Sequence, residues 1–122
     1  MSKKILIVDD SATMRQQVNF TLSKSGFTVV EANDGQEGIA KIKEHQDLAL
    51  IISDVNMPVM NGIEMLEEIK KQQLSSKVPC IMLTTEGKAE LIERAKLAGV
   101  KGWIVKPFKP EQLVAIVTKI AI

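Results

Sequence analysis

The chain has 122 residues, of which 45% are hydrophobic and 25% are charged, and its formal net charge is +1. This length is typical of one domain with a single buried core, and the composition is that of a globular rather than a disordered protein. No apolar run is longer than that of residues 48–52, which is far shorter than the ~20 residues that a membrane-spanning helix needs. Because the charge is nearly balanced, the chain offers no broad cationic surface, and we expect no nucleic-acid partner.

The amino-terminal segment and the single cysteine indicate the cell compartment and the state of the thiol. The amino terminus, MSKKILIVDD, turns acidic where a secretory signal would continue its apolar stretch, so we expect a cytoplasmic protein. Cys80 is the only cysteine, which excludes a disulfide within the chain. Since it lies in the apolar run VPCIML, we expect a small buried thiol rather than a reactive one.

Short β-like runs alternate with amphipathic segments along the whole chain. The β-like runs are KILIVD, TVVEA, LALIISD, CIMLTT and GWIVK, and most are continuously apolar, as strands buried on both faces are. Apolar residues recur at helical spacing in the segments 14–22, 39–42, 63–69, 91–98 and 113–120. Five repeats of strand then helix predict an α/β fold, in which an open parallel sheet carries helices on both faces.

Residues typical of helix ends flank these segments. An N-cap residue followed three positions later by glutamate marks a helix start, glycine often follows a helix end, and proline suits the first helical turn. The starts are Asp34 with Glu37 and Asn61 with Glu64, the ends are Gly26 and Gly99, and the proline is Pro110.

Polar side chains gather where the predicted strands end. In an open parallel sheet, the loops after the carboxyl ends of the strands meet at one edge, and ligands bind there. A single acid at such a place can instead be a helix N-cap, and this alternative stays open for Asp9 or Asp10 taken alone. The residues at these ends are Asp9 and Asp10, Asp54, Thr84 and Thr85, and Lys106.

As a set, these residues require a cation, because carboxylates brought together repel one another. Mg²⁺ fits, since it is a hard cation that binds one or two carboxylates together with waters and a phosphate oxygen. With the metal on Asp10 and Asp54, one oxygen of Asp54 could attack phosphorus and form an aspartyl phosphate. Lys106 would then neutralise phosphoryl oxygens, while the Thr84 hydroxyl would donate a hydrogen bond to one of them.

Four motifs, ILIVDDS, IISDVNMPVMNG, IMLTTEG and GWIVKPF, resemble in order and spacing the receiver domain of two-component response regulators. The resemblance covers essentially the whole chain. It implies a flavodoxin-like, doubly wound sheet with strand order 2-1-3-4-5 and five helices. It also implies that Asp54 is the phosphoacceptor, that Lys106 contacts the phosphoryl group and that Thr84 is the switch hydroxyl.

The same resemblance implies a metal site and a peptide isomer. Mg²⁺ would be the cofactor, held by Asp9, Asp10 and Asp54 together with the backbone carbonyl of Asn56. The bond between Lys106 and Pro107 would be a cis peptide, an isomer that is cheap only before proline.

The segments SATMR, TTEGK and KGWIVKPF are most similar to stand-alone chemotaxis receivers of the CheY type. The resemblance therefore implies a single receiver domain, residues 1–122, without an output domain and acting as a monomer. A chemotaxis-type histidine kinase would phosphorylate it, the flagellar motor switch protein would bind the phosphorylated form, and a separate phosphatase is possible. Such a protein is not a conventional enzyme, because it would catalyse only its own phosphorylation and dephosphorylation.

Three residues near the site have two interpretations each. Trp103 stands where the family often carries tyrosine or phenylalanine as a rotameric switch, so it is either ordinary packing or that switch. Its position three residues before Lys106 favours the switch, although an indole N–H can only donate a hydrogen bond. Asn56 and Glu86 are either solvated loop residues or residues that tune dephosphorylation, and the resemblance favours tuning.

Other functions fit the residues less well. A phosphohydrolase with an aspartate nucleophile would need an acid two residues after Asp54, where Asn56 cannot protonate a leaving group. A flavodoxin-like nucleotide carrier would place phosphate beside Asp9 and Asp10, which repel an anion. Within the receiver class, a phosphorelay intermediate or a regulator of something other than the motor stays open.

Overall fold

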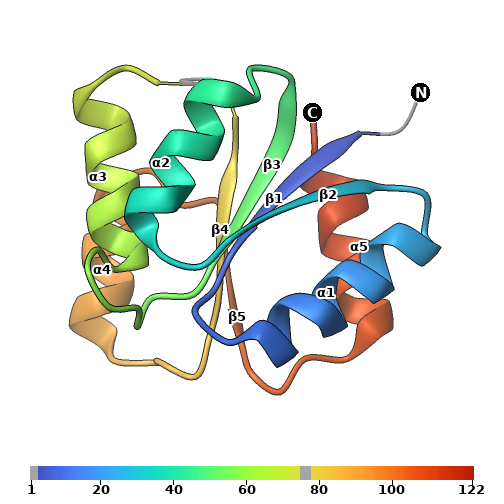
Figure 1. The fold of residues 1–122 in the computed structure, drawn as a ribbon. Helices are drawn as coiled ribbons and strands as arrows, with labels where there is room; N and C mark the ends of the chain where they lie inside the picture. Colours follow the sequence, from blue (N-terminus) through green and yellow to red (C-terminus); the bar gives the residue numbers. More distant parts are fainter. Residues whose placement is uncertain (1–2, 75–77) are drawn as a thin grey trace.

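A parallel β-sheet forms the centre of the molecule (Figure 1). In the computed structural model, which describes residues 3–74 and 78–122, the sheet has five strands in the order β2-β1-β3-β4-β5. Every pairing between neighbouring strands is parallel. The predicted α/β fold and its strand order are therefore confirmed. The strands are β1 (Lys4–Val8), β2 (Thr28–Ala32), β3 (Leu48–Ser53), β4 (Cys80–Thr84) and β5 (Gly102–Val105).

Five helices, all within the same described ranges, cover the two faces of the sheet. Figure 1 shows α1 and α5 on one face and α2, α3 and α4 on the other. None of them combines the length and the apolar character that crossing a membrane would require. The helices are α1 (Ala12–Lys24), α2 (Gly35–Glu44), α3 (Gly62–Lys71), α4 (Ala89–Leu97) and α5 (Pro110–Ile120).

The strand side chains alternate between two apolar cores. In β1, Leu6 and Val8 belong to the core beneath α2, α3 and α4, whereas Ile5 and Ile7 belong to the core beneath α1 and α5. Successive side chains of a strand point to opposite faces, so a strand covered on both sides must be apolar at every position. β3 shows the result, because all of its residues from Leu48 to Ser53 are buried.

The helix ends lie where the sequence predicts them. Asn61 and Glu64 form a capping box at the start of α3, in which each side chain accepts a hydrogen bond from the other residue's backbone N–H. Gly26 and Gly99 follow α1 and α4 with φ angles of 95° and 96°, which glycine adopts without strain. Pro110 is the first residue of α5.

The N-cap of α1 is Ser11, whose hydroxyl accepts a hydrogen bond from the Met14 N–H at 3.2 Å. Neither Asp9 nor Asp10 caps this helix. The alternative that one of these acids is merely a helix cap is therefore wrong, and both carboxylates are left for other interactions.

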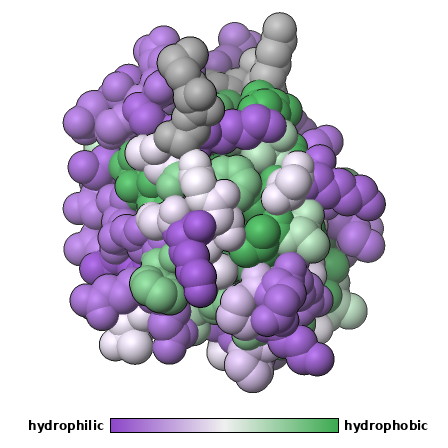
Figure 2. Space-filling model, turned by 90° about the vertical axis from the view of Figure 1, so that its right-hand side faces the viewer, coloured by the Kyte–Doolittle hydropathy of each residue, from purple (hydrophilic) through white to green (hydrophobic). Residues whose placement is uncertain are grey.

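The face that carries α1 and α5 is largely hydrophilic, with apolar side chains exposed among the polar ones (Figure 2). Phe20 of α1 is 70% exposed, and the Lys24 ammonium lies 6.0 Å from the centre of its ring. α1 buries only Val18 and Leu22 completely. This helix therefore packs on the sheet through a narrow stripe and presents most of its surface to solvent.

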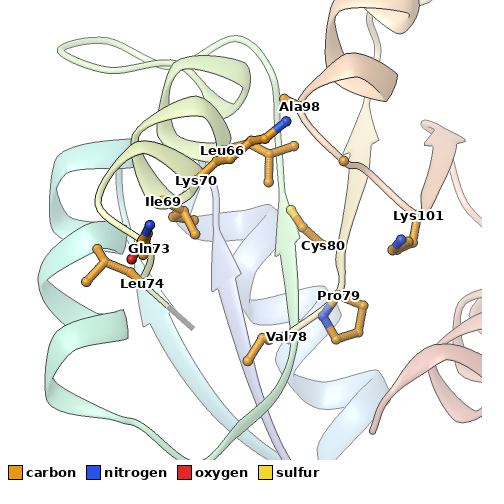
Figure 3. A pocket seen from close by; sticks show the side chains of 11 residues that line it. Leu66, Ile69, Lys70, Gln73, Leu74, Val78, Pro79, Cys80, Ala98 and Lys101 are labelled. Atoms are coloured by element: carbon orange, nitrogen blue, oxygen red, sulfur yellow. The ribbon is translucent and has the colours of Figure 1, made fainter. Parts of the chain in front are cut away.

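Cys80, at the start of β4, is buried as predicted. It lies beside a cavity of about 300 Å³ between α3, the start of β4 and the end of α4 (Figure 3). Burial raises the pKa of the thiol to about 12. Because the thiolate is the reactive form, the thiol is inert at neutral pH.

The first residue of α3 packs directly against the end of β3. The Gly62 N–H donates to the Val55 carbonyl at 3.0 Å. A Cβ on Gly62 would clash with the carbonyl oxygen of Asp54 and would lie 2.8 Å from the Ser53 hydroxyl oxygen. Only glycine lets the helix approach the strand end this closely.

We expect Gly62→Ala to lower the free energy of unfolding by about 1–3 kcal/mol, the usual cost of overpacking, because the backbone of Asp54 must shift. The matched control is Gly87→Ala, where a Cβ would meet no described atom within 4 Å. Urea unfolding followed by circular dichroism measures both variants. Equal stability of the two variants would contradict the close packing of α3 on this strand end.

Candidate functional site

The carboxyl ends of β1, β3, β4 and β5 bring the polar residues of the sequence motifs to one edge of the sheet. Asp9 follows β1, Asp54 follows β3, Thr84 ends β4 and Lys106 follows β5. The backbone ladder continues past the strands: the Asp54 N–H donates to the Val8 carbonyl at 2.9 Å, and the Lys106 N–H donates to the Thr84 carbonyl at 2.8 Å. The sheet itself therefore positions these side chains.

Three carboxylates meet at this edge. One carboxylate oxygen from each of Asp9, Asp10 and Asp54 lies within 4.8 Å of the other two. Asp9 and Asp54 are buried, with 3% and 9% of their surface exposed, whereas Asp10 faces solvent. This cluster gathers several hard oxygen donors within reach of one small ion, with one side open to water.

The ammonium of Lys106 bridges the two buried carboxylates. It donates to Asp9 Oδ2 at 2.8 Å and to Asp54 Oδ2 at 3.2 Å, and its side chain is only 10% exposed. Burial is the largest influence on the pKa of Lys106 and lowers it, but the hydrogen bond to Asp9 and the charges of Asp54 and Asp9 outweigh burial, so the pKa rises. Lys106 is therefore a cation at physiological pH.

Backbone N–H groups hold the other oxygen of Asp54. Asp54 Oδ1 accepts from the Val55 N–H at 2.7 Å and more weakly from the Asn56 N–H at 3.4 Å. The carboxylate is thus fixed between the loop that follows it and the Lys106 ammonium. A carboxylate held in one orientation at an open edge is a suitable nucleophile.

Glu86, in the loop between β4 and α4, connects three of the predicted residues. Its N–H donates to the Thr84 hydroxyl oxygen at 3.1 Å, and its carboxylate accepts from the Asn56 amide at 3.3 Å. Its carbonyl accepts from the Trp103 indole N–H at 3.0 Å. The side chains of Thr84, Asn56 and Trp103 therefore meet at one residue.

The remaining predicted features lie in the same region. The peptide between Lys106 and Pro107 is cis, as the resemblance implies. Trp103 is half-buried, packs against the core beneath α2, α3 and α4, and also makes its hydrogen bond to Glu86. Thr85 is exposed, whereas Thr84 is completely buried, so only Thr84 faces inward.

The sequence interpretation missed residues that hold the first loop of the site. The Ser11 N–H donates to Asp9 Oδ1 at 2.9 Å. An Arg15 nitrogen donates to the Asp9 carbonyl at 2.6 Å, and another to Glu31 at 3.0 Å. Ser11 had a signal, since it follows the acid pair and precedes a helix, but Glu31 lies on another strand, where no local pattern links it to Arg15.

The cavity beside Cys80 is separate from this site. Its lining residues come from the end of α3, the start of β4 and the end of α4 (Figure 3). The cavity therefore lies near the amino ends of β4 and β5, whereas the carboxylates lie at the carboxyl ends of the strands. None of the lining residues belongs to the loops that carry the carboxylates.

Comparisons with known proteins agree with this geometry. Residues 5–118 match the response regulator receiver domain. The chain is 45% identical over 112 residues to the chemotaxis protein CheY1 of Helicobacter pylori, with 90% of each chain covered. It is 40% identical over 120 residues to the chemotaxis protein CheY of Bacillus subtilis, with 98% of each covered.

Solved structures show the same relationship. The structure of Vibrio cholerae CheY4 superposes with a TM-score of 0.91 at 42% identity, covering 98% of this chain and 99% of that one. A complex of CheX, CheY, BeF₃ and Mg²⁺ from Borrelia burgdorferi gives a TM-score of 0.89 at 30% identity, covering 96% of this chain and 87% of that one. Together with the arrangement of acids and lysine at the strand ends, these matches show that the chain belongs to the response regulator receiver family and is of the CheY type.

Proposed function

We propose that this chain is a single-domain chemotaxis response regulator that accepts a phosphoryl group on Asp54 from a histidine kinase. The observation that carries the proposal is the partly buried Lys106 ammonium, bonded to both Asp9 and Asp54 beside the exposed Asp10. This arrangement supplies a nucleophile, a cation for phosphoryl oxygens and an acidic pocket for a metal ion. The named chemotaxis relatives support the signalling role.

The donor set fits Mg²⁺. Asp9, Asp10 and Asp54 would hold the ion together with the backbone carbonyl of Asn56, and all of these are the oxygen ligands that Mg²⁺ prefers. When bound, the ion would neutralise negative charge that accumulates around the transferred phosphoryl group. The structural neighbour from Borrelia burgdorferi, a complex containing BeF₃ and Mg²⁺, supports the choice of Mg²⁺ as the ion.

The chain's own residues would carry out the transfer as follows. A carboxylate oxygen of Asp54 forms the new O–P bond while the N–P bond to the kinase histidine breaks and the imidazole keeps the electron pair. Lys106, already charged and directed at Asp54, stabilises phosphoryl oxygens. The site would thus promote both its own phosphorylation and the later hydrolysis, without turning over an external substrate.

The signal would leave the site through Glu86. Phosphorylation adds charge and acceptor oxygens beside Thr84, whose hydroxyl now accepts from the Glu86 N–H. If that hydroxyl turns to donate to the phosphoryl group, the loop at Glu86 and the indole bonded to its carbonyl must adjust. The face formed by α4, β5 and α5 would then bind the flagellar motor switch protein, while a phosphatase or a CheX-like protein would be a further partner.

Asp54→Asn should abolish phosphorylation by acetyl phosphate, because an amide oxygen is a poor nucleophile and the substitution removes a negative charge from the metal site. Intact-mass measurement after incubation with acetyl phosphate and Mg²⁺ tests this result. The matched control is Asp47→Asn, since Asp47 is exposed and pairs with Lys4 away from the site.

The wild type and the control should gain one phosphoryl group, and excess chelator should prevent the gain. Full labelling of Asp54→Asn, or labelling of the wild type in chelator, would overturn the assignment of Asp54 and of the metal dependence. Phosphorylation without binding to a motor switch protein would point to a phosphorelay intermediate or another target instead.

Trp103 should report the phosphorylated state by its fluorescence. It is the only tryptophan and the chain has no tyrosine, so emission and quenching come almost entirely from this indole. Beryllofluoride with Mg²⁺ should change both, because the hydrogen bond to Glu86 links the indole to Thr84.

Thr84→Ala should reduce this change, whereas Thr84→Ser, which keeps the hydroxyl, should retain it. Binding of beryllofluoride is checked separately by ¹⁹F NMR. If the wild type binds beryllofluoride with unchanged emission and quenching, Trp103 has no part in the switch.

The phosphoryl group should be lost within seconds to about a minute at room temperature, because Asn56 and Glu86 are polar and lie together at the site mouth, where they can orient a water. Replacing both by bulky apolar residues, Asn56→Met with Glu86→Leu, should slow the loss roughly ten-fold, or ~1.4 kcal/mol of barrier. Release of phosphate after removal of the donor measures the rate.

The control is Glu90→Leu, an exposed residue of α4 that should leave the rate unchanged. A wild-type half-life of hours would argue against a rapidly resetting chemotaxis signal and for a slower regulatory role.

A further inference from the structure

Arg15 connects α1, β2 and the loop after β1, close to the three carboxylates. It lies on α1, and one guanidinium nitrogen donates to the Asp9 carbonyl at 2.6 Å while Nε donates to Glu31 of β2 at 3.0 Å. Asn19, one turn further along α1, donates to the second oxygen of Glu31 at 2.8 Å. The Arg15 side chain is 19% exposed and that of Glu31 is 36% exposed, so these bonds are partly shielded from solvent.

The position of the Asp9 carbonyl affects both acids of the pair. It belongs to the peptide bond between Asp9 and Asp10, and a peptide is planar, so the orientation of this plane constrains the backbone of both acids. The Asp9 N–H donates to the Ala32 carbonyl at 3.1 Å, and its carboxylate is held by Ser11 and Lys106. With the bond from Arg15, the N–H, the carboxylate and the carbonyl of Asp9 are all held, and Asp10 is the next residue in the chain.

The ion pair with Glu31 explains why arginine rather than lysine suits this position. A guanidinium is planar and presents several donors in fixed directions, so it can bond to a carboxylate and a carbonyl at the same time. Glu31 also neutralises the charge of Arg15 close to the site, so the brace adds little net positive charge beside the carboxylates. The Arg15–Glu31 pair thus orients the loop after β1 without placing an unbalanced positive charge that would compete with a metal ion for the carboxylates.

We propose that Arg15, supported by Glu31, is a positioning residue that pre-orients Asp9 and Asp10 for the divalent cation. This inference rests on the proposed function, in which these acids hold Mg²⁺. Arg15 need not touch the ion or the phosphoryl group. It acts through the Asp9–Asp10 peptide. Loss of Arg15 removes no ligand atom, but the ligand atoms are then no longer held in one arrangement.

The test compares Mg²⁺ binding by the wild type and by Arg15→Met, which keeps a long side chain but removes every donor. Amide NMR shifts of the unphosphorylated proteins, titrated with MgCl₂, give the dissociation constants without any phosphoryl transfer. Residues that orient metal ligands commonly change affinity 10- to 100-fold, and we expect about ten-fold weaker binding. The matched control is Arg94→Met, which breaks an exposed arginine–glutamate pair with Glu67 between α4 and α3 and should leave Mg²⁺ binding unchanged.

Phosphorylation kinetics with acetyl phosphate separate positioning from general damage to the fold. In Arg15→Met the half-saturating Mg²⁺ concentration should rise about ten-fold, while the rate at saturating Mg²⁺ stays within about two-fold of the wild type. If Arg15→Met does not fold, as judged by circular dichroism, Arg15→Lys takes its place, because an ammonium lacks the planar fork; it should weaken Mg²⁺ binding at least three-fold.

Two outcomes would overturn this inference in distinguishable ways. If the wild type binds Mg²⁺ and the folded variant binds it equally well, the positioning role is wrong while the proposed function stands. If the wild type itself shows no Mg²⁺-dependent shifts at Asp9, Asp10 or Asp54, the proposed function fails and the positioning role fails with it.

Discussion

Three carboxylates are held together at the ends of neighbouring parallel strands, and the rest of the site compensates for their mutual repulsion. Lys106 supplies one positive charge between Asp9 and Asp54, but one ammonium cannot balance three carboxylates. The excess negative charge attracts a cation and opposes the approach of an anionic phosphoryl donor. A metal ion that binds at the open, Asp10 side would remove that opposition, so the same repulsion accounts for both the metal preference and the proposed metal dependence.

Such a cluster persists only because the backbone around it is fixed. Pairing of β1 with β3 places Asp9 and Asp54 beside each other, and the apolar cores on both faces of the sheet keep those strands in register. α3 approaches the end of β3 so closely that only glycine fits at residue 62. Burial of apolar side chains away from the site thus adds to the stabilisation that Lys106 supplies between Asp9 and Asp54.

The link from the site to the surface is short. Thr84 and Trp103 lie on adjacent strands and both bond to Glu86, one through its N–H and the other through its carbonyl. An indole can only donate a hydrogen bond, so Trp103 needs an acceptor, and the Glu86 carbonyl provides it. A single residue, Glu86, therefore connects the Thr84 hydroxyl to the side chain of Trp103 on β5.

The sequence by itself determined the α/β architecture and the location of the candidate site. Continuous apolar runs such as LALIIS are typical of strands covered on both faces, and local residues such as Asn61 with Glu64 determine where helices begin. The acids could be assigned to one site because they follow predicted strands, and the carboxyl ends of parallel strands meet at one side of the sheet. These features depend on the period of the pattern and on neighbours a few residues apart, which a sequence displays directly.

The tertiary structure alone decided how the acids are held and how Thr84 and Trp103 are connected through Glu86. Arg15 and Glu31, or Trp103 and Glu86, are far apart in the chain, and each pair meets only after strands and helices have packed. The sequence identified Trp103 but left its role open between packing and switching, and the structure shows that it packs on the core and also bonds to the loop after β4. Such pairs escape sequence analysis because a hydrogen bond depends on distances of a few ångströms, and no local pattern encodes the distance between two elements that are brought together by the packing of the whole core.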